Sequence, residues 1–394
     1  MSSVREAAGM SAPVQFPTDA VPAARAFRVD DSAPTVFDRI SILRFPLVVS
    51  VIFYHSGSGG QYRKAISPGW VRSVIDFLSE GLGSIRMPAL FLIAGYVFFL
   101  GVKKGTPWYL RKISSRQRSL MLPHIAWTTI SIALISAAHM LPIADTVFTG
   151  DSVWSASLSR FSFVDWCLAY FGGYEHLFLY QLWFTRDLFL LCVASPLIYQ
   201  FVRIGREHAL VSVLLVWLWG IQMPLPISTM AFAFFTIGAC LAVNRQSMFF
   251  ADMIGPSALV MWLVYQVYDA AVDPALTATR SRILIALGVV AALYATHLLA
   301  RAPRMSAVLS KAAKYSFCLF VMQEPTLTVV RKGLGRLLPS MPPEIGYFAC
   351  PVATILLIVG IYETLYRVCP LLLSVLDGGR IARKRKDVHA TSSF

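Results

Sequence analysis

Charged residues are scarce in this chain, and acidic residues are the scarcer kind. Only 14% of its 394 residues are charged, with 21 Asp and Glu against 35 Lys and Arg. About a quarter of the residues of a soluble domain are charged. This shortage, together with 56% hydrophobic residues, argues against a soluble enzyme and indicates a lipid bilayer as the solvent.

Sequence motifs for metals, nucleotides and nucleic acids are also lacking. The six cysteines are scattered without metal-type spacing, and we interpret them as small core residues. No P-loop, nucleophile elbow, dinucleotide fingerprint or zinc motif occurs, which argues against soluble kinases and hydrolases. The net charge of +14 comes from short basic clusters between apolar runs, which are typical of topology signals and headgroup contacts rather than of nucleic-acid binding. We expect no bound metal, and we interpret four histidines as packing or interfacial residues: His124, His139, His176 and His297.

What the chain does have is a series of apolar runs. Ten are long enough to cross a hydrocarbon layer of about 30 Å, which predicts an all-α, polytopic membrane helix bundle with about ten transmembrane helices. The runs are 40–57, 85–101, 119–141, 183–202, 208–223, 227–243, 248–268, 282–300, 313–330 and 345–373. Residues 1–37 are predicted to be a disordered cytoplasmic tail, 38–374 the transmembrane domain, and 375–394 a basic cytoplasmic tail.

The distribution of Lys and Arg predicts the topology. An even number of spans places both termini on one side, and the connections on that side carry more cations, so we expect both termini in the cytoplasm. Arg331, Lys332 and Arg336 are the exception, because this topology places them outside. Either a span nearby is miscounted, or these cations form an outer surface for an anionic acceptor. The outer segment 142–182 is predicted to be either a re-entrant lid or a loop with an interfacial helix.

The first apolar run carries two costly polar residues, Arg44 and His55. In a regular helix, eleven residues place the two side chains on nearly the same face, about 16 Å apart along the axis. Ionisable residues inside a membrane span usually face a bundle interior or a wet cavity and are functional candidates. The alternative is that Arg44 extends to the interface and His55 bonds a neighbouring helix.

Four stretches together resemble the membrane acyltransferase-3 family. They are Arg44-x10-His55, the run from Met87 through Gly95, the basic stretch that ends at Pro123, and Gln181 through Leu188. No single stretch is distinctive, but their order and spacing are, and the resemblance covers about residues 37–372. It implies an integral membrane enzyme that transfers an acyl group, commonly acetyl, to a hydroxyl of a surface carbohydrate.

The resemblance implies roles for both residues of the first run. His55 corresponds to the histidine needed for transfer, and its imidazole can act either as the general base for the acceptor hydroxyl or as a transient acyl carrier. Arg44 is too far from His55 to touch the same carbonyl, so we expect it to hold a phosphate or pantetheine portion of the donor, or to pair with an acid. Gln323 lies near the position where the family often has another histidine, so no second catalytic histidine is carried over.

The basic stretch before the third run has two interpretations. Arginine binds phosphate through paired donors, so these cations are candidates for binding acyl-coenzyme A. Alternatively, they only fix topology or meet anionic lipid. The residues are Arg111, Lys112, Arg116 and Arg118.

Five further residues are candidates for supporting roles. Trp183 suits an interfacial belt or a sugar-stacking surface. Arg186 and Asp187 are adjacent on a helix, so we expect each to meet a different partner. Glu324 and Glu363 are candidates for countering Arg44 or orienting His55.

The leading hypothesis is an inner-membrane O-acyltransferase that uses acyl-coenzyme A, with acetyl-coenzyme A as the expected donor. The acceptor would be a carbohydrate or a lipid-linked glycan, and polysaccharide-assembly proteins would be partners. The alternatives are a transporter or flippase for a sugar or anionic substrate, and an assembly partner without chemistry.

Overall fold

The computed structural model describes residues 35–58, 65–67, 69–102, 106–140, 158–173, 175–222, 226–271 and 278–380. Over these residues the fold is all-α, without a β-strand, as predicted. Most of the two predicted tails, namely 1–34 and 381–394, lies outside the described residues, as do Lys103, Lys104 and, in the predicted outer segment, 142–157 and 174.

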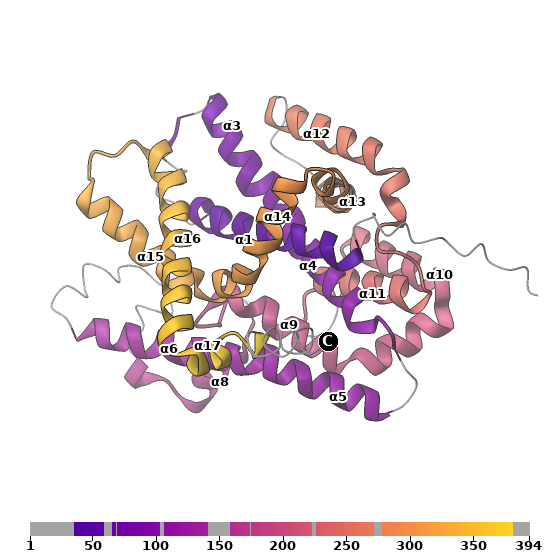
Figure 1. The fold of residues 1–394 in the computed structure, drawn as a ribbon, viewed down its shortest axis with the longest axis horizontal. Helices are drawn as coiled ribbons and strands as arrows, with labels where there is room; N and C mark the ends of the chain where they lie inside the picture. Colours follow the sequence, from indigo (N-terminus) through magenta and orange to yellow (C-terminus); the bar gives the residue numbers. More distant parts are fainter. Residues whose placement is uncertain are drawn as a thin grey trace, which may run out of the picture. The chain divides into compact units, whose positions relative to one another are not determined.

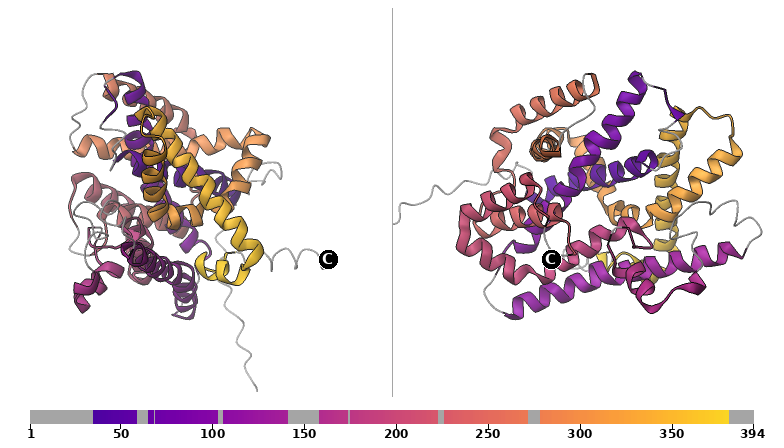
Figure 2. Two further views of the ribbon diagram at one scale, coloured as in Figure 1. Left: turned by 90° about the vertical axis from the view of Figure 1, so that its left-hand side faces the viewer. Right: turned by 180° about the vertical axis from the view of Figure 1, so that it is seen from behind.

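The first part of the bundle consists of α1 and two long helical runs. Helix α1 spans Val36–Ser58 and is followed by α3 (Trp70–Asp76), the π-helical η1 (Phe77–Gly81) and α4 (Leu82–Phe99). The next run consists of α5 (Thr106–Arg116), the π-helical η2 (Gln117–Met121) and α6 (Leu122–His139). Figure 1 and the right-hand view of Figure 2 show α5 and α6 continuing one another as a single rod.

The middle and the end of the chain add shorter and longer helices. The middle elements are η3 (Leu158–Arg160), α8 (Phe163–Phe171), η4 (Tyr180–Leu182), α9 (Trp183–Val193), α10 (Ser195–Trp219) and α11 (Thr229–Val243). Next come η5 (Phe250–Met253), α12 (Gly255–Ala271), α13 (Ala278–Ala300), α14 (Pro303–Ala312) and η6 (Ala313–Tyr315). The last helices are α15 (Ser316–Leu337), α16 (Pro343–Val368) and α17 (Pro370–Leu376).

Several of these helices can cross a hydrocarbon layer. Within the described residues, five are long and apolar enough, and a sixth span results if the pair Tyr180–Val193 and Ser195–Trp219, bent by 64°, is one broken span. Each of the ten predicted runs overlaps a helix, but the number of ten spans is not confirmed.

Helix α1 lies inside the bundle and packs against many partners. It contacts α4, α13, α14, α15 and α16 (Figure 1). Its first turns are anchored by Arg39, which pairs with Asp252 at 2.6 Å and donates to the Thr296 hydroxyl at 2.8 Å. The Arg39 guanidinium also lies 3.5 Å from the centre of the Phe249 ring. A buried arginine bonded through all three of its side-chain nitrogens fixes the position of α1 against η5 and α13.

Helices α4 and α11 pack with their backbones in close contact. A Cβ atom built on Gly95 would lie 2.1 Å from the Phe235 carbonyl oxygen, and one on Gly238 would lie 2.2 Å from that of Leu92. Only glycine fits at such distances, and small residues at helix crossings are typical of membrane bundles. This packing fixes α4, and α4 in turn packs against α1.

Candidate functional site

Arg44 and His55 lie on one uninterrupted helix, as the sequence predicts. Helix α1 continues through Pro46, so the axial separation of the two residues is about 16 Å. The Arg44 side chain is exposed, whereas that of His55 is half-buried. The two residues therefore mark two separate polar regions at different heights along α1.

The region at His55 is built from aromatic rings and a buried cation. The His55 ring lies 5.0 Å from the Tyr180 ring and 5.1 Å from the Tyr54 ring, edge to face in both cases. The Arg86 guanidinium lies 4.0 Å from the centre of the Tyr54 ring, is only 7% exposed, and acts electrostatically on His55. Sequence reasoning missed Arg86 and Tyr180, although an arginine inside a predicted span was a signal for Arg86.

Glu324 is joined to the His55 region through Tyr180. The Tyr180 hydroxyl donates to Glu324 Oε1 at 3.3 Å, and the Thr328 hydroxyl donates to Glu324 Oε2 at 2.8 Å. Arg331 in turn donates to the Thr328 oxygen at 3.3 Å. Glu324 was predicted either to counter Arg44 or to orient His55. Its hydrogen bond to Tyr180, whose ring contacts that of His55, places the carboxylate on the side of His55.

The position of Glu324 follows from the residue after it. Helix α15 is broken at Glu324, where φ is −112° and ψ is 135°. Pro325 disfavours the α-helical conformation in the residue before it, because its ring clashes with that residue's backbone. Gln181 donates to the Glu324 carbonyl oxygen at 3.2 Å and so satisfies a group at the break. The carboxylate lies at this break, and the residue is only 3% exposed.

Glu363 occupies a different environment. Its Oε1 accepts from Lys314 at 2.8 Å and from the Tyr315 hydroxyl at 2.6 Å, and its side chain is 31% exposed. The structure brings Glu363 to this surface ion pair rather than to His55. Its supporting role remains a prediction.

The region at Arg44 gathers cations from three parts of the chain. The Arg44 and Arg116 guanidinium groups are close enough to act on one another electrostatically, and Lys112 interacts with Arg116 in the same way. Arg380, beyond α17, interacts with both Arg44 and Arg116. Such a cluster of like charges favours an anionic ligand, because the repulsion is relieved when the ligand is bound.

The four predicted donor residues divide between two faces of the rod from α5 to η2. Lys112 and Arg116 are one helical turn apart and half-buried. Lys112 Nζ lies 5.3 Å from the centre of the Trp108 ring, and Arg116 Cζ lies 5.9 Å from the centre of the Phe98 ring. Arg111 and Arg118 are exposed on the other face. There they line an open groove of about 440 Å³ together with Leu110, Ser114 and Ser115. Of these four described residues, Arg116, on the face shared with Lys112, is the one that acts electrostatically on Arg44.

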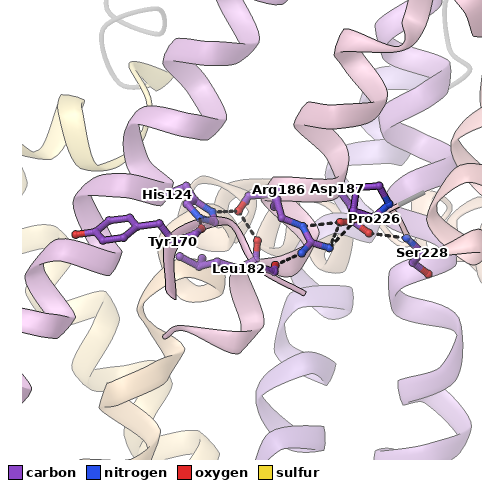
Figure 3. A network of polar contacts seen from close by, with 9 residues as sticks. His124, Tyr170, Leu182, Arg186, Asp187, Pro226 and Ser228 are labelled. Atoms are coloured by element: carbon purple, nitrogen blue, oxygen red, sulfur yellow. Dashed lines mark hydrogen bonds and ion pairs between the residues drawn. The ribbon is translucent and has the colours of Figure 1, made fainter. Parts of the chain in front are cut away.

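A polar network joins α6, α8 and α9 (Figure 3). His124 Nδ1 bonds the Thr185 hydroxyl at 2.9 Å, and its Nε2 donates to the Tyr170 carbonyl oxygen at 2.7 Å. Arg186 also donates to the Gly172 carbonyl oxygen on the end of α8. The network thus holds α8, which lies within the predicted outer segment, against α6 and α9.

Arg186 and Asp187 each meet partners of their own, as expected, but they also pair with one another, which was not expected. Arg186 Nη2 lies 2.6 Å from Asp187 Oδ1, because the long guanidinium side chain curls along the first turn of α9 to reach its neighbour. The Ser228 backbone N–H donates to the other Asp187 oxygen at 3.0 Å, and Arg186 donates to the Pro226 carbonyl oxygen at 3.2 Å (Figure 3). The pair thereby joins α9 to the start of α11.

Trp183, His139 and His297 have local contacts within the bundle. Trp183 is half-buried, with its ring 5.8 Å from that of Phe91. His139 bonds the Ile135 carbonyl oxygen, and the His297 ring stacks at 5.9 Å on that of Tyr294. In the part of the chain that the structure describes, no group of three His, Cys, Asp or Glu residues is arranged to hold a metal ion.

The chain is similar to a known protein family and to a known protein. The family model described as "Acyltransferase domain" (acyltransferase-3) matches residues 37–363. The chain is similar to the succinoglycan biosynthesis protein ExoH of Rhizobium meliloti (strain 1021), with 24% identity over 368 residues, which cover 88% of this chain and 93% of that protein. No solved structure matches the chain.

Proposed function

Because the chain belongs to the acyltransferase-3 family and is a multi-pass membrane acyltransferase, we propose that it transfers an acetyl group from acetyl-coenzyme A to a carbohydrate hydroxyl. The acceptor would be a surface or exported polysaccharide or its lipid-linked precursor. The protein would lie in the inner membrane. The relative's role in succinoglycan biosynthesis supports a polysaccharide acceptor.

The observation that carries this proposal is the separation of two polar regions along α1. The cations around Arg44 can hold the phosphates of coenzyme A, since arginine binds phosphate through paired donors. The pantetheine arm separates those phosphates from the thioester. A donor bound at Arg44 and extended along α1 therefore presents its thioester toward His55, about 16 Å away.

His55 would act as the general base for the acceptor. Its neutral imidazole takes the proton of the acceptor hydroxyl as the oxygen attacks the thioester carbonyl. The tetrahedral intermediate then expels the coenzyme A thiolate, which recovers the proton from the imidazolium, so that ester and thiol are the products. Tyr180 lies against the His55 ring and is bonded to Glu324, and this arrangement supports a fixed orientation of the ring. Attack by His55 itself, giving an acyl-imidazole, is the competing course.

The test is transfer of label from [acetyl-¹⁴C]acetyl-coenzyme A to lipid-linked and polymeric glycans by the purified protein. We expect an alkali-labile label on the glycan, as for an O-ester, and release of one coenzyme A per ester. Retention of all label in the thioester, with movement of the glycan across a proteoliposome membrane, would contradict the proposal and favour a flippase.

A further inference from the structure

The segment after α17 is fixed against η2, although it lies beyond the matched acyltransferase domain. Gly378 has a φ of +70°, and a Cβ atom on it would lie 2.6 Å from the Ser119 carbonyl oxygen. The Trp127 indole N–H donates to the Leu376 carbonyl oxygen at 3.1 Å. A left-handed glycine in direct backbone contact fixes the course of the chain toward Arg380.

The Arg380 side chain is held in a defined orientation. Its Nη1 donates to the carbonyl oxygens of Ser119, at 3.2 Å, and Asp377, and its Cζ lies 3.5 Å from the centre of the Phe317 ring. Ser119 follows Arg116 by about one helical turn. The contact with Ser119 therefore brings the Arg380 guanidinium to the face of α5 and η2 that carries Arg116. Phe317 belongs to α15, which packs against α1.

The electrostatic surroundings of Arg380 are unfavourable for an unliganded cation. Burial lowers the pKa of Arg380 to about 10, the Asp377 carboxylate and Cys318 act in the opposite direction, and the positive charges of Arg44 and Arg116 lower it by smaller amounts. The Arg380 backbone N–H donates to Asp377 Oδ1 at 3.0 Å, so this carboxylate also caps the turn. Arg380 remains protonated at neutral pH, and the charges of Arg44 and Arg116 act on it.

We propose that Arg380 completes the phosphate-binding site at the Arg44 end of α1, so that Arg44, Arg116 and Arg380 together hold the phosphate groups of the coenzyme A thioester. This inference rests on the proposed function and assigns a binding role to a residue beyond the acyltransferase domain. Three elements supply one guanidinium each: α1, α5 and the turn after α17. A phosphate placed among them offsets their mutual repulsion, and each guanidinium can donate two hydrogen bonds to it.

The first test is kinetic and uses the full-length protein. Arg380→Gln should raise KM for acetyl-coenzyme A about tenfold, which is the effect expected from the loss of one charge-assisted hydrogen bond. It should leave kcat within about twofold of the wild-type value. KM for acetyl-pantetheine, which lacks the nucleotide and its phosphates, should not change. Arg380→Lys keeps the charge and should fall between the wild type and Arg380→Gln. Arg367→Gln, an exposed arginine at the end of α16, is the matched control and should leave both constants unchanged.

The second test separates this inference from the proposed function. Binding of coenzyme A is measured by calorimetry on His55→Ala and on the double variant His55→Ala with Arg380→Gln, in nanodiscs with and without anionic lipid. We expect about tenfold weaker binding in the double variant, whatever the lipid. Equal affinities would overturn the role of Arg380 alone, and a difference confined to anionic nanodiscs would assign it to a lipid phosphate instead. Absence of coenzyme A binding in both variants would overturn the proposed function itself.

If Arg380→Gln does not fold, Arg380→Lys replaces it in both assays. Unchanged donor affinity and unchanged KM in Arg380→Lys would overturn the role of the paired donors of Arg380.

Discussion

The ring of His55 meets the ring of Tyr180 edge to face, with centroids 5.0 Å apart, and the Tyr180 hydroxyl donates to the buried Glu324. The three residues come from α1, η4 and the break in α15. Tyr180, on η4, therefore lies between the His55 ring on α1 and the Glu324 carboxylate on α15. Tyr180 and Glu324 are positioning residues in this account, because they act on the reaction through His55.

Removal of the Tyr180 hydroxyl should slow the chemical step. Tyr180→Phe keeps the ring contact with His55 but loses the hydrogen bond to Glu324, and we expect kcat to fall about tenfold with KM for acetyl-coenzyme A unchanged. Steady-state kinetics on the purified protein measures both constants. A rise in KM without a fall in kcat would place Tyr180 in donor binding instead.

The charge of Glu324 should matter more than that of Glu363. Glu324→Gln keeps the shape of a side chain that is 3% exposed but weakens the bonds from Tyr180 and Thr328, so kcat should fall about tenfold or more. Glu363→Gln weakens only a partly exposed ion pair with Lys314 and should change kcat by less than about twofold. Equal losses in the two variants would contradict the placement of Glu324 at the site.

The two faces of the basic rod should differ in their effect on the donor. Arg116→Gln and Lys112→Gln remove charges from the face that meets Arg44, so each should raise KM for acetyl-coenzyme A about tenfold. Arg111→Gln and Arg118→Gln alter the exposed groove and serve as matched controls, with KM changed less than about twofold. The opposite pattern would assign the donor to the groove.

The close contact of α4 with α11 should limit which substitutions the bundle tolerates. Gly238→Ala places a methyl group 2.2 Å from the Leu92 carbonyl oxygen, which forces the two backbones apart. We expect a cost of about 1–3 kcal/mol, seen as a lower melting temperature in detergent. Gly360→Ala on α16, where nothing lies within 4 Å of the new Cβ, is the control and should melt at or slightly above the wild-type temperature.

The sequence predicted the positions of the helices well, because a helix that crosses a lipid bilayer must consist of a long apolar run. It did not settle the number of spans, because bends such as the 64° one between α9 and α10 do not appear in composition. It carried Arg44 and His55 correctly onto one helix. It could not choose a partner for Glu324, because that choice depends on how α15 and η4 pack, which no local pattern encodes.

Other site residues were within reach of the sequence. Arg86 carried a signal, since it lies inside a predicted span. The division of the basic stretch into two faces follows from helical periodicity, because Lys112 and Arg116 are four residues apart. The contact of Arg186 with Asp187 was missed because adjacency on a helix was taken to prevent pairing, whereas a long side chain can bend back at the first turn.

In the proposed mechanism, α1 divides the reaction between two ends, with donor phosphates at Arg44 and transfer at His55. The most direct measurement compares kcat and KM for acetyl-coenzyme A in Arg44→Gln and His55→Ala. We predict that Arg44→Gln raises KM about tenfold or more with kcat little changed. His55→Ala should lower kcat by about 10² to 10⁴ and still bind coenzyme A. Wild-type kcat in His55→Ala, or loss of coenzyme A binding in that variant alone, would contradict the account.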